Sequence, residues 1–594
     1  MIIKKVKFLF FIIFFIFLFF NKSYIEEVTL EAKKTKLPSR PIIIDETEPL
    51  YGTLNTIFNF RARVIETTDP IKDVSLYIND KKYTVKLKPS GFYEYQIKGE
   101  DLGYGMHFYK WIAIDKKDRV CTPVSGIIKI ASNRIKVNQV GYRTKAKKLA
   151  FVTYSDTTDW TGEDEGVPPK SYATKFKVVN AITKNVVYEG SLTKPKWDEN
   201  SWDYVQKADF SSITTEGIYY IKVDGIGESC WFLIGDDVYS DLAKTLIRSY
   251  YLQRCGEYIN DKISGVYHKA CHLFDALYFN RDDAPSKMWD AGTPNKLNPD
   301  GTPAIGISQK VVPLGFLNGG WHDAGDYNKY ATSGLFSCAV LLWCYEKMPE
   351  KFSDGELEIP ESGNGVPDLL DEVKVYLDWI LKCQIKEGGF GHPSIGIYKD
   401  KREVGAVYHK VSTFDFGEFV PPDQEGLPRY VAGITTTDAG LFAGVMAKAS
   451  RIYKSFYPLQ AEEYLKAAEL AWKWLKTKKE NDPKWIGGDE GQQPENMNTG
   501  PYVSKAGDVD ERFFAAAELF RTTGKQEYED YVLAKYADEN NWKTELGAPR
   551  ATISAFDWAD VHTLGMWCYY ETLLSKKELN EAQKEAKEFI ESKA

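Results

Sequence analysis

The sequence predicts a multidomain chain in which an all-β N-terminal part precedes an all-α part. Short runs of alternating polar and apolar residues continue to about residue 235, and apolar residues at helical spacing follow from there. The length of 594 residues is enough for roughly three or four domains. With 43% hydrophobic and 27% charged residues, the composition is that of a globular protein and not of a disordered tail.

The N-terminus has the pattern of an export signal. Three lysines among the first seven residues precede an unbroken apolar run at 8–20, which is short for a membrane span but typical of a signal peptide. Because no A-x-A cleavage site follows, we expect residues 1–25 to be either a signal peptide or an N-terminal anchor. This predicts a secreted or cell-surface protein that meets a membrane only through this segment. Residues 26–40 are polar and are predicted to be a linker.

Two successive β-sandwiches are predicted between the linker and the helical part. The first, at 41–132, contains short runs such as "VSLYIND" and "KKYTVKLK", separated by turn signals that include Asn79-Asp80. The second, at 134–235, contains "KFKVVNA" and "GIYYIKVDG". Several short strands at such spacing are typical of immunoglobulin-like sandwiches.

Residues 237–594 are predicted to be mainly helical. In "VPDLLDEVKVYLDWILKCQ", Pro367 lies near the first turn and the apolar residues fall on one stripe of a helix. Two long stretches, 273–325 and 386–436, are predicted to be loops, and loops of that length inside a compact domain are usually functional. Further helices are expected at 331–347, 437–454, 459–478, 510–523, 525–537, 559–574 and 577–593.

The charge and the aromatic content restrict the set of functions that is expected for this chain. The net charge is −8 and no basic face is available to hold nucleic acid. Aromatic residues make up 14% of the chain, and Tyr and Trp combine an apolar face with a polar tip that suits stacking on sugar rings. The same residues could simply fill a large core. The sequence does not indicate an oligomeric state.

The stretch "GGWHDAGDYNKY", residues 319–330, combines glycines, aromatics and acids. Asp323 and Asp326 lie three residues apart in it, although an ordinary core excludes unpaired carboxylates. The combination predicts a groove for a polar, flat-faced ligand such as a sugar. The alternative is an Asx-turn or a calcium loop, because Asp-x-Gly-Asp also suits hard cations.

Several stretches together resemble glycoside hydrolase family 9, over roughly residues 134–575. "RIKVNQVGY" at 134–142 is similar to the immunoglobulin-like module that precedes the catalytic domain in many of these cellulases. The resemblance implies an (α/α)6 barrel that hydrolyses β-1,4-glucosidic bonds in cellulose or related β-glucans by an inverting mechanism. The stretches in the helical part are "SYYLQRCG", "ACHLFDA", "GGWHDAGDYNKY", "ESGNGVPDLLDE", "VYHKVS" and "DVDERFFAAAELF".

The resemblance also implies roles for individual residues. Asp326 would be the general base, and Asp323 would help to hold the water molecule. Such a base takes a proton from water on one face of the sugar, opposite an acid about 6.5–9.5 Å away. Residues considered for sugar contacts, each of which could equally belong to the core, are Trp321, Tyr327, Tyr330, Tyr408, His409 and Tyr430.

The sequence departs from the family near its C-terminus. The family's general acid is a Glu in a segment that reads roughly N-E-x-x-x-(N/D), and no counterpart is found here. Asn580-Glu581 lies on a Lys- and Glu-rich stretch that is predicted to be a solvated helical face. We therefore expect an incomplete barrel that lacks its last helices and its general acid. The alternative is a non-catalytic carbohydrate-binding or surface protein derived from such an enzyme.

Two cysteines and two histidines could form a metal site. Cys-x15-Cys-His is not a zinc-finger spacing, but two Cys and two His make a complete tetrahedral zinc set, and the resemblance implies a structural zinc at these positions. A Cys255–Cys271 disulfide is the alternative. The four residues are Cys255, Cys271, His272 and His322. Calcium near Asp508, Asp510 and Glu511 is also considered, although an acidic helix N-terminus explains these residues equally well.

Overall fold

The structure is a computed structural model that divides into two compact units, Met1–Leu242 and Ala243–Ala594. The segments predicted to be a signal peptide or anchor and a linker lie outside its described residues. Within the part of the chain that is described, no helix has both the length and the apolar character needed to cross a bilayer. The described residues are 41–65, 69–154, 169–278, 315–386, 403–413, 420–427, 429–480, 507–536 and 556–593.

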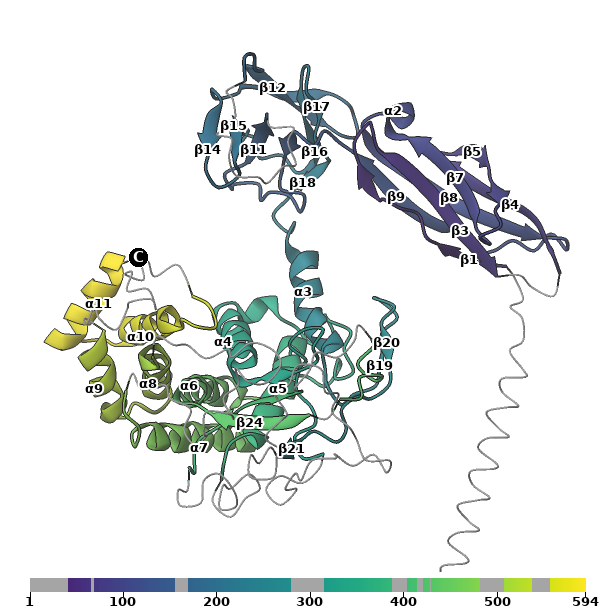
Figure 1. The fold of residues 1–594 in the computed structure, drawn as a ribbon. Coiled ribbons are helices and arrows are strands. Elements are labelled where there is room, and N and C mark those ends of the chain that lie inside the picture. Colours follow the sequence, from purple (N-terminus) through teal and green to yellow (C-terminus); the bar gives the residue numbers. More distant parts are fainter. Residues whose placement is uncertain are drawn as a thin grey trace, which may run out of the picture. The chain divides into compact units, whose positions relative to one another are not determined.

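The first unit begins with a two-sheet sandwich (Figure 1). Alternate residues of its long strand β8 are buried, among them Tyr109, Trp111 and Ala113, as expected for a strand with one face toward a core. One sheet has the order β1 (Ile42–Asp45), β3 (Ile57–Ile65), β7 (Tyr93–Lys98), β6 (Lys86–Leu87). The other has the order β2 (Tyr51–Gly52), β9 (Val124–Ile130), β8 (Gly105–Asp115), β4 (Ile71–Ile78), β5 (Lys81–Thr84).

The second sandwich of this unit is also built from two antiparallel sheets. Its core is apolar and includes Val152, Val178, Ile221 and Phe232. One sheet has the order β10 (Ile135–Lys136), β11 (Leu149–Thr153), β15 (Asp203–Asp209), β14 (Lys196–Asp198). The other contains β13 (Val186–Ser191), β12 (Lys175–Asn180), β16 (Gly217–Val223), β17 (Gly227–Glu228) and β18 (Phe232–Ile234).

The second unit is a two-row array of helices (Figure 1). In the first row α4, α6, α8 and α10 pack one against the next, and in the second row α5, α7, α9 and α11 each pack on one of them. The helices are α3 (Ser240–Leu252), α4 (Ala331–Lys347), α5 (Asp368–Lys382), α6 (Thr436–Tyr453), α7 (Pro458–Leu475), α8 (Val509–Thr523), α9 (Gln526–Lys535), α10 (His562–Ser575) and α11 (Glu581–Lys593). A helical region behind a β-rich N-terminal part, as the sequence predicts, is thus confirmed.

Ion pairs join the C-terminal ends of the four helices of the first row, which shows that these helices run parallel. Glu346 of α4 is 2.8 Å from Arg451 of α6, and Lys448 of α6 is 2.8 Å from Glu518 of α8. Arg521 of α8 reaches the α10 carboxylate of Glu571 at 2.6 Å. The N-terminal ends of the same helices therefore lie together on the opposite side of the row, which is called its N-terminal end below.

A small sheet covers this N-terminal end. It includes strands inside the predicted loops 273–325 and 386–436, and the prediction of uninterrupted loops there is wrong. All five residues of β23 are buried, so this strand has no polar–apolar alternation that a sequence pattern could reveal. The sheet has the order β21 (Leu277–Tyr278), β24 (Tyr430–Ile434), β23 (Tyr408–Ser412), β22 (Lys329–Tyr330). The domain boundaries at 41–132, 134–235 and 237–594 stay predictions.

Candidate active site and metal centre

The turn before α4 brings the two predicted catalytic carboxylates to the N-terminal end of the helical row. It is closed by backbone hydrogen bonds from Asp323 N–H to Asn328 O at 2.8 Å and from Tyr327 N–H to Ala324 O at 3.1 Å. Gly320 has a φ of 76°, and a Cβ at this position would lie 2.8 Å from the Trp379 ring. Only glycine satisfies both conditions, so this position fixes how closely the turn approaches the helices.

The carboxylate of Asp326 is buried and held by three donors. The backbone N–H and the side-chain amide of Asn328 donate to it at 3.2 and 3.1 Å. The phenol of Tyr330 donates to Oδ2 at 3.0 Å. Burial, followed by the charge of Asp326, raises the pKa of Tyr330, so the phenol stays protonated and remains a donor. These contacts fix the direction in which the Asp326 carboxylate points.

Asp323 is more open than Asp326. It is half-buried, and its Oδ1 accepts a hydrogen bond from the Ser333 hydroxyl at 2.7 Å. A cavity of about 220 Å³ adjoins it, with Trp321 and Tyr330 also in its wall. Asp326 does not belong to that wall. The structure therefore places one carboxylate of the turn at a cavity, and the other is hydrogen-bonded to Tyr330 of the cavity wall.

The six residues predicted to contact sugar differ in their surroundings, and three of them come from the turn before α4. Trp321 and Tyr330 line the cavity, and Trp321 Nε1 also donates to Glu372 Oε1 at 2.8 Å. Tyr327 instead packs its ring against His322, with centroids 5.2 Å apart, and donates to the carbonyl of Val420. Sugar contact by any of these residues stays a prediction.

The remaining three lie on the small sheet. Tyr408 is 3% exposed on β23, and His409 beside it is fully buried, with Nδ1 2.8 Å from Asp438 Oδ2. Tyr430 belongs to β24, but its side chain is outside the described part of the structure. Burial leaves Tyr408 and His409 little surface for a sugar, and their role as contacts stays a prediction.

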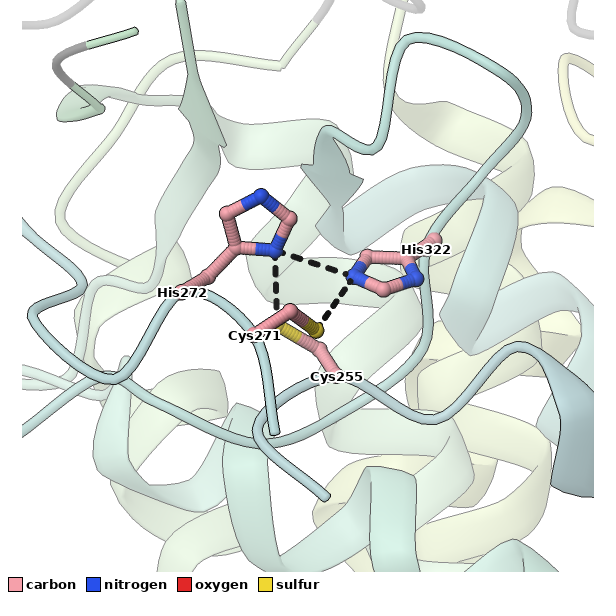
Figure 2. Close-up of side chains that lie close together, drawn as sticks. All are labelled: Cys255, Cys271, His272 and His322. Atoms are coloured by element: carbon pink, nitrogen blue, oxygen red, sulfur yellow. Dashed lines mark hydrogen bonds between the residues drawn. The ribbon is translucent and has the colours of Figure 1, made fainter. Parts of the chain in front are cut away.

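The four predicted metal ligands converge on one point. Figure 2 shows the two thiols and the two imidazoles turned toward one another, and their donor atoms all lie within 4.8 Å. The sulfur of Cys255 is 3.7 Å from Nδ1 of His272, the sulfur of Cys271 is 3.6 Å from Nε2 of His322, and the two ring nitrogens are 3.2 Å apart. A tetrahedral zinc ion implies S···N and N···N separations of about 3.5 and 3.3 Å. The donor set and its spacing therefore fit zinc.

The electrostatics favour the metal-binding form of two of the four groups, His322 and Cys255. Burial lowers the pKa of His322, which keeps its imidazole neutral. Burial disfavours the Cys255 thiolate, but the hydrogen bond from Cys271 and the charge of Lys329 lower the pKa of Cys255 overall. The hydrogen bond with Cys255 raises the pKa of Cys271. Burial acts to lower the pKa of His272, but hydrogen bonds with Cys255 and Glu425 raise it overall. Both cysteines are free thiols in the structure, so the alternative Cys255–Cys271 disulfide is not formed.

A second layer of charged residues surrounds this centre, and the sequence did not reveal it. Glu425 Oε2 lies 3.1 Å from the outward Nε2 of His272, the arrangement that orients a metal-binding histidine. Arg429 donates to Asp275 at 2.8 Å, and Lys329 forms an ion pair with the same carboxylate at 2.8 Å. Glu425 and His272 are 153 positions apart, so no local pattern could have linked them.

Calcium near the start of α8 stays a prediction. Asp508 accepts a hydrogen bond from Arg512 at 2.9 Å, and Asp510 accepts the backbone N–H of Val561 at 2.9 Å. Burial and the neighbouring Asp510 raise the pKa of Glu511. Among the described residues, the cysteine–histidine group is the only set of three or more such donors that converges closely enough for a metal ion.

The Asn580-Glu581 pair has a local explanation. Asn580 Oδ1 accepts the backbone N–H of Gln583 at 2.9 Å, and the Gln583 side chain accepts the backbone N–H of Asn580 at 3.1 Å. This reciprocal pair is a capping box, and Glu581 is the acidic first residue of α11. The side chain of Glu581 is 83% exposed, as expected for a solvated helix face.

The fold and the site define a class of proteins, namely helical glycoside hydrolases with β-sandwich modules. A family model described as glycosyl hydrolase family 9 matches residues 239–594, and one described as a cellulase N-terminal ig-like domain matches residues 131–228. The chain belongs to glycosyl hydrolase family 9. The resemblance seen in the sequence is thereby confirmed.

Known proteins of this family are similar in sequence to most of this chain. Endoglucanase D of Acetivibrio thermocellus is 30% identical over 75% of this chain, which spans 58% of the length of that relative. A Bacteroides ovatus xyloglucan-specific endo-beta-1,4-glucanase, BoGH9A, is 32% identical over 78% of this chain and 67% of its own. A solved structure described as a Zn-binding triple mutant of GH family 9 endoglucanase J30 matches with a TM-score of 0.57 and 31% identity, covering 76% of this chain and 70% of its own.

Proposed function

We propose that this chain hydrolyses β-1,4-glucosidic bonds in cellulose or a related β-glucan with inversion, and that Asp326 is the general base with Asp323 beside it. One observation carries the proposal: a buried Asp326 carboxylate oriented by Asn328 and Tyr330, in a turn whose other carboxylate adjoins a cavity. The N-terminal export pattern supports action outside the cell. We also infer that α4, α6, α8 and α10 belong to the inner ring of an (α/α)6 barrel.

The turn can act on a water molecule. In the proposed step, Asp326 takes a proton from water while Asp323 helps to position it, and the oxygen of that water bonds to the anomeric carbon as the bond between that carbon and the leaving glycosidic oxygen breaks. Because Asn328 and Tyr330 hold the Asp326 carboxylate, little motion is needed when the proton moves. In this proposal Asp326 and Asp323 would supply the base side of the reaction. The acid that protonates the leaving oxygen is assigned to none of the described residues, and an incomplete barrel stays a prediction.

A structural zinc ion is part of the proposal. Cys255, Cys271, His272 and His322 would hold it, and it would supply a rigid cross-link between segments that are distant in sequence. Because His322 directly precedes Asp323, the same cross-link would hold the start of the carboxylate turn.

Sugar contacts and substrate complete the proposal. Trp321 and Tyr330 have the strongest support as contacts, since both line the cavity beside Asp323. Two relatives are named a xyloglucan-specific endo-beta-1,4-glucanase and an endoglucanase. These names support a β-1,4-linked glucan backbone as substrate and cleavage at internal bonds of the glucan.

The test is release of reducing ends from soluble cellulose derivatives and from xyloglucan. We expect Asp326→Ala to lower the rate about 10²–10⁴-fold, the usual contribution of a general base. Asp354→Asn is a suitable control, because Asp354 is also a loop carboxylate that accepts backbone N–H groups, from Gly363 and Gly365. Equal release by the unsubstituted chain and by Asp326→Ala would remove the catalytic assignment. Glucan binding without any release would favour the non-catalytic alternative.

A further inference from the structure

The β14–β15 hairpin of the second sandwich presents an aromatic side chain to solvent. Strand pairing ends at Asp198 and Asp203, which leaves a four-residue turn at 199–202. Trp202, the last residue of that turn, is 54% exposed. Among the tryptophans that the structure describes, it is the only one with more than half of its surface exposed.

The backbone at Trp202 is unfavourable for a large residue. Its φ is 52°, in the left-handed region that glycine adopts freely and bulky side chains rarely occupy. A glycine would form the same turn without strain, so the turn itself does not explain a tryptophan there. Residues held in such conformations concentrate at functional sites. The side chain of Trp202 is therefore the feature that requires an explanation.

Two further aromatic rings support Trp202 from behind. Trp197 and Tyr204 are directly opposite each other on the two strands, with ring centroids 5.3 Å apart. The ring of Trp202 meets Trp197 edge to face, at a centroid distance of 6.4 Å and an angle of 81°. Figure 1 shows that β14 and β15 lie side by side. The exposed indole is thus in contact with a packed pair of rings and is not an isolated surface side chain.

The groups around the indole are acids, amides and hydroxyls. Asp198 Oδ2 accepts the backbone N–H of Ser201 at 3.0 Å and its hydroxyl at 2.6 Å, which fixes the turn. Glu199 and Asn200 are exposed beside it, and residues 198–203 include no basic side chain. A flat apolar face next to hydrogen-bond acceptors suits a neutral polyhydroxylated ring, whose hydroxyls donate to the acids while its apolar face lies on the indole.

We propose that this turn is a second binding site for the β-glucan, distinct from the carboxylate turn of the helical unit. The choice of ligand rests on the proposed function, because a polymer can occupy two sites on one protein at once. Attachment at the second site converts binding in the active site into an intramolecular event and raises the local concentration of substrate. Short oligosaccharides would gain nothing from it.

The experiment uses the full chain with Trp202→Ala, Trp202→Gly and Trp202→Tyr. Retardation in native gels that contain soluble hydroxyethylcellulose or xyloglucan, and adsorption to insoluble cellulose, measure binding. We expect the Ala and Gly variants to bind at least about tenfold more weakly, and the Tyr variant to bind within about threefold of the unsubstituted chain. Release of reducing ends should fall on insoluble glucan and stay unchanged on short soluble oligosaccharides.

Thermal unfolding separates a binding role from a structural one. Trp202→Gly should keep or raise the unfolding temperature of the chain, because glycine relieves the strained φ while the aromatic surface is removed. Phe108→Ala is the matched control, since Phe108 is an aromatic residue on β8 with 57% exposure, and it should bind glucan normally. Unchanged binding by Trp202→Gly, or an equal loss in Phe108→Ala, would overturn the proposal.

The test of the second binding site does not depend on whether the chain is catalytically active. If the unsubstituted chain binds glucan through Trp202 but releases no reducing ends, the proposed function fails and the second site stands. If Trp202→Gly lowers only self-association, measured by sedimentation, and leaves glucan binding intact, the site is a contact between copies of the chain and the proposal is overturned.

Discussion

Arg429 donates a hydrogen bond from Nη2 to the backbone carbonyl of Tyr327 at 2.7 Å, and so holds the residue that follows Asp326 in the carboxylate turn. Its Nε donates to Asp275 at 2.8 Å. Asp275 is also paired with Lys329, two residues beyond Tyr327. The turn is therefore fixed from behind by a buried group of charges, and Tyr327 keeps a φ of 54° within it.

Substitution of Arg429 should lower catalysis without a matching loss of substrate affinity. Lysine has one ammonium in place of the planar fork, so Arg429→Lys cannot keep both the Asp275 and the Tyr327 contacts. A small displacement of Asp326 would then lower kcat about 10–100-fold, with KM changed less than threefold. Steady-state kinetics on a soluble cellulose derivative measure both constants.

Arg248→Lys is a matched control for this substitution. Arg248 lies on α3 and, like Arg429, binds one carboxylate, Asp261 at 2.8 Å, and one backbone carbonyl, Leu357 O at 2.7 Å. Neither of these hydrogen-bond partners belongs to the carboxylate turn, so its substitution should lower stability but leave kcat close to that of the unsubstituted chain. A similar fall of kcat in both variants would mean that Arg429 acts only through stability.

Removal of the metal should destabilise the chain. We expect about one zinc ion per chain by elemental analysis, and a chelator should lower the unfolding temperature by more than about 5 °C, because a ligand of the folded state stabilises it. Cys255→Ala should lose the zinc and unfold at the temperature of the chelated chain. Calorimetry with and without added zinc measures the effect.

Cys383→Ala provides the comparison, because Cys255 and Cys383 are both 1% exposed. Cys383 belongs to the apolar core and not to the metal cluster, so its variant should keep the zinc. Full reactivity of all eight cysteines as thiols in the denatured, metal-free chain is also expected. Two missing thiols and no zinc would instead indicate the disulfide.

Local sequence patterns predicted the helices of this fold well. The helix expected at 331–347 is α4, Ala331–Lys347, and the one expected at 437–454 is α6, Thr436–Tyr453. Each is rich in apolar residues within its own segment, so no distant contact is needed to recognise it. The metal ligands, in contrast, were identified mainly through resemblance to a family, since their spacing has no meaning before the chain is folded.

The buried charged residues that hold the carboxylate turn could not be predicted from such local patterns. Arg429 and Asp275 are 154 positions apart, and although Asp275 lies in "ACHLFDA", no local pattern links it to Arg429. His409 was considered either a sugar contact or a core residue, and the structure buries it against Asp438. Burial of a polar side chain depends on a partner from another segment, and a single stretch of sequence does not show that partner.

Stability should depend on pH through Asp371 of α5. Burial, opposed by the hydrogen bond from Asn364 and aided by the charges of Glu361 and Asp368, raises the pKa of Asp371 from 3.8 to about 6. The folded state therefore favours the protonated form, and this contribution to stability is complete below about pH 4 and is lost as the pH rises through 6. Asp371→Asn should be more stable than the unsubstituted chain by about 1–2 kcal/mol at pH 7.5 and equal to it at pH 4. Urea denaturation at the two pH values measures this difference.

Substitution of Asp368, one turn earlier on the same helix, by asparagine should have the opposite effect on stability at pH 7.5. It accepts backbone N–H groups of Gly355 and Leu357 at 2.9 and 2.7 Å, and the Ser362 hydroxyl at 2.8 Å. Asparagine cannot accept all three with the same geometry, so Asp368→Asn should be destabilised at pH 7.5. Stabilisation of both variants would show that net charge, and not the burial of Asp371, causes the effect.

The close approach of α6 to α8 depends on glycine. A Cβ at Gly444 would lie 2.4 Å from ring atoms of Phe514, and one at Gly440 would lie 2.8 Å from Cβ of Glu511. Alanine is the better helix former by about 1 kcal/mol, yet Gly444→Ala should destabilise the chain by about 1–3 kcal/mol, because the core there has no room for a methyl group. Phe514→Ala alone leaves a cavity and should also destabilise. In the double variant the new methyl group enters that cavity, so the combined loss measured by urea denaturation should be smaller than the sum of the single losses. Strict additivity would mean that Gly444 and Phe514 do not limit the separation of the two helices.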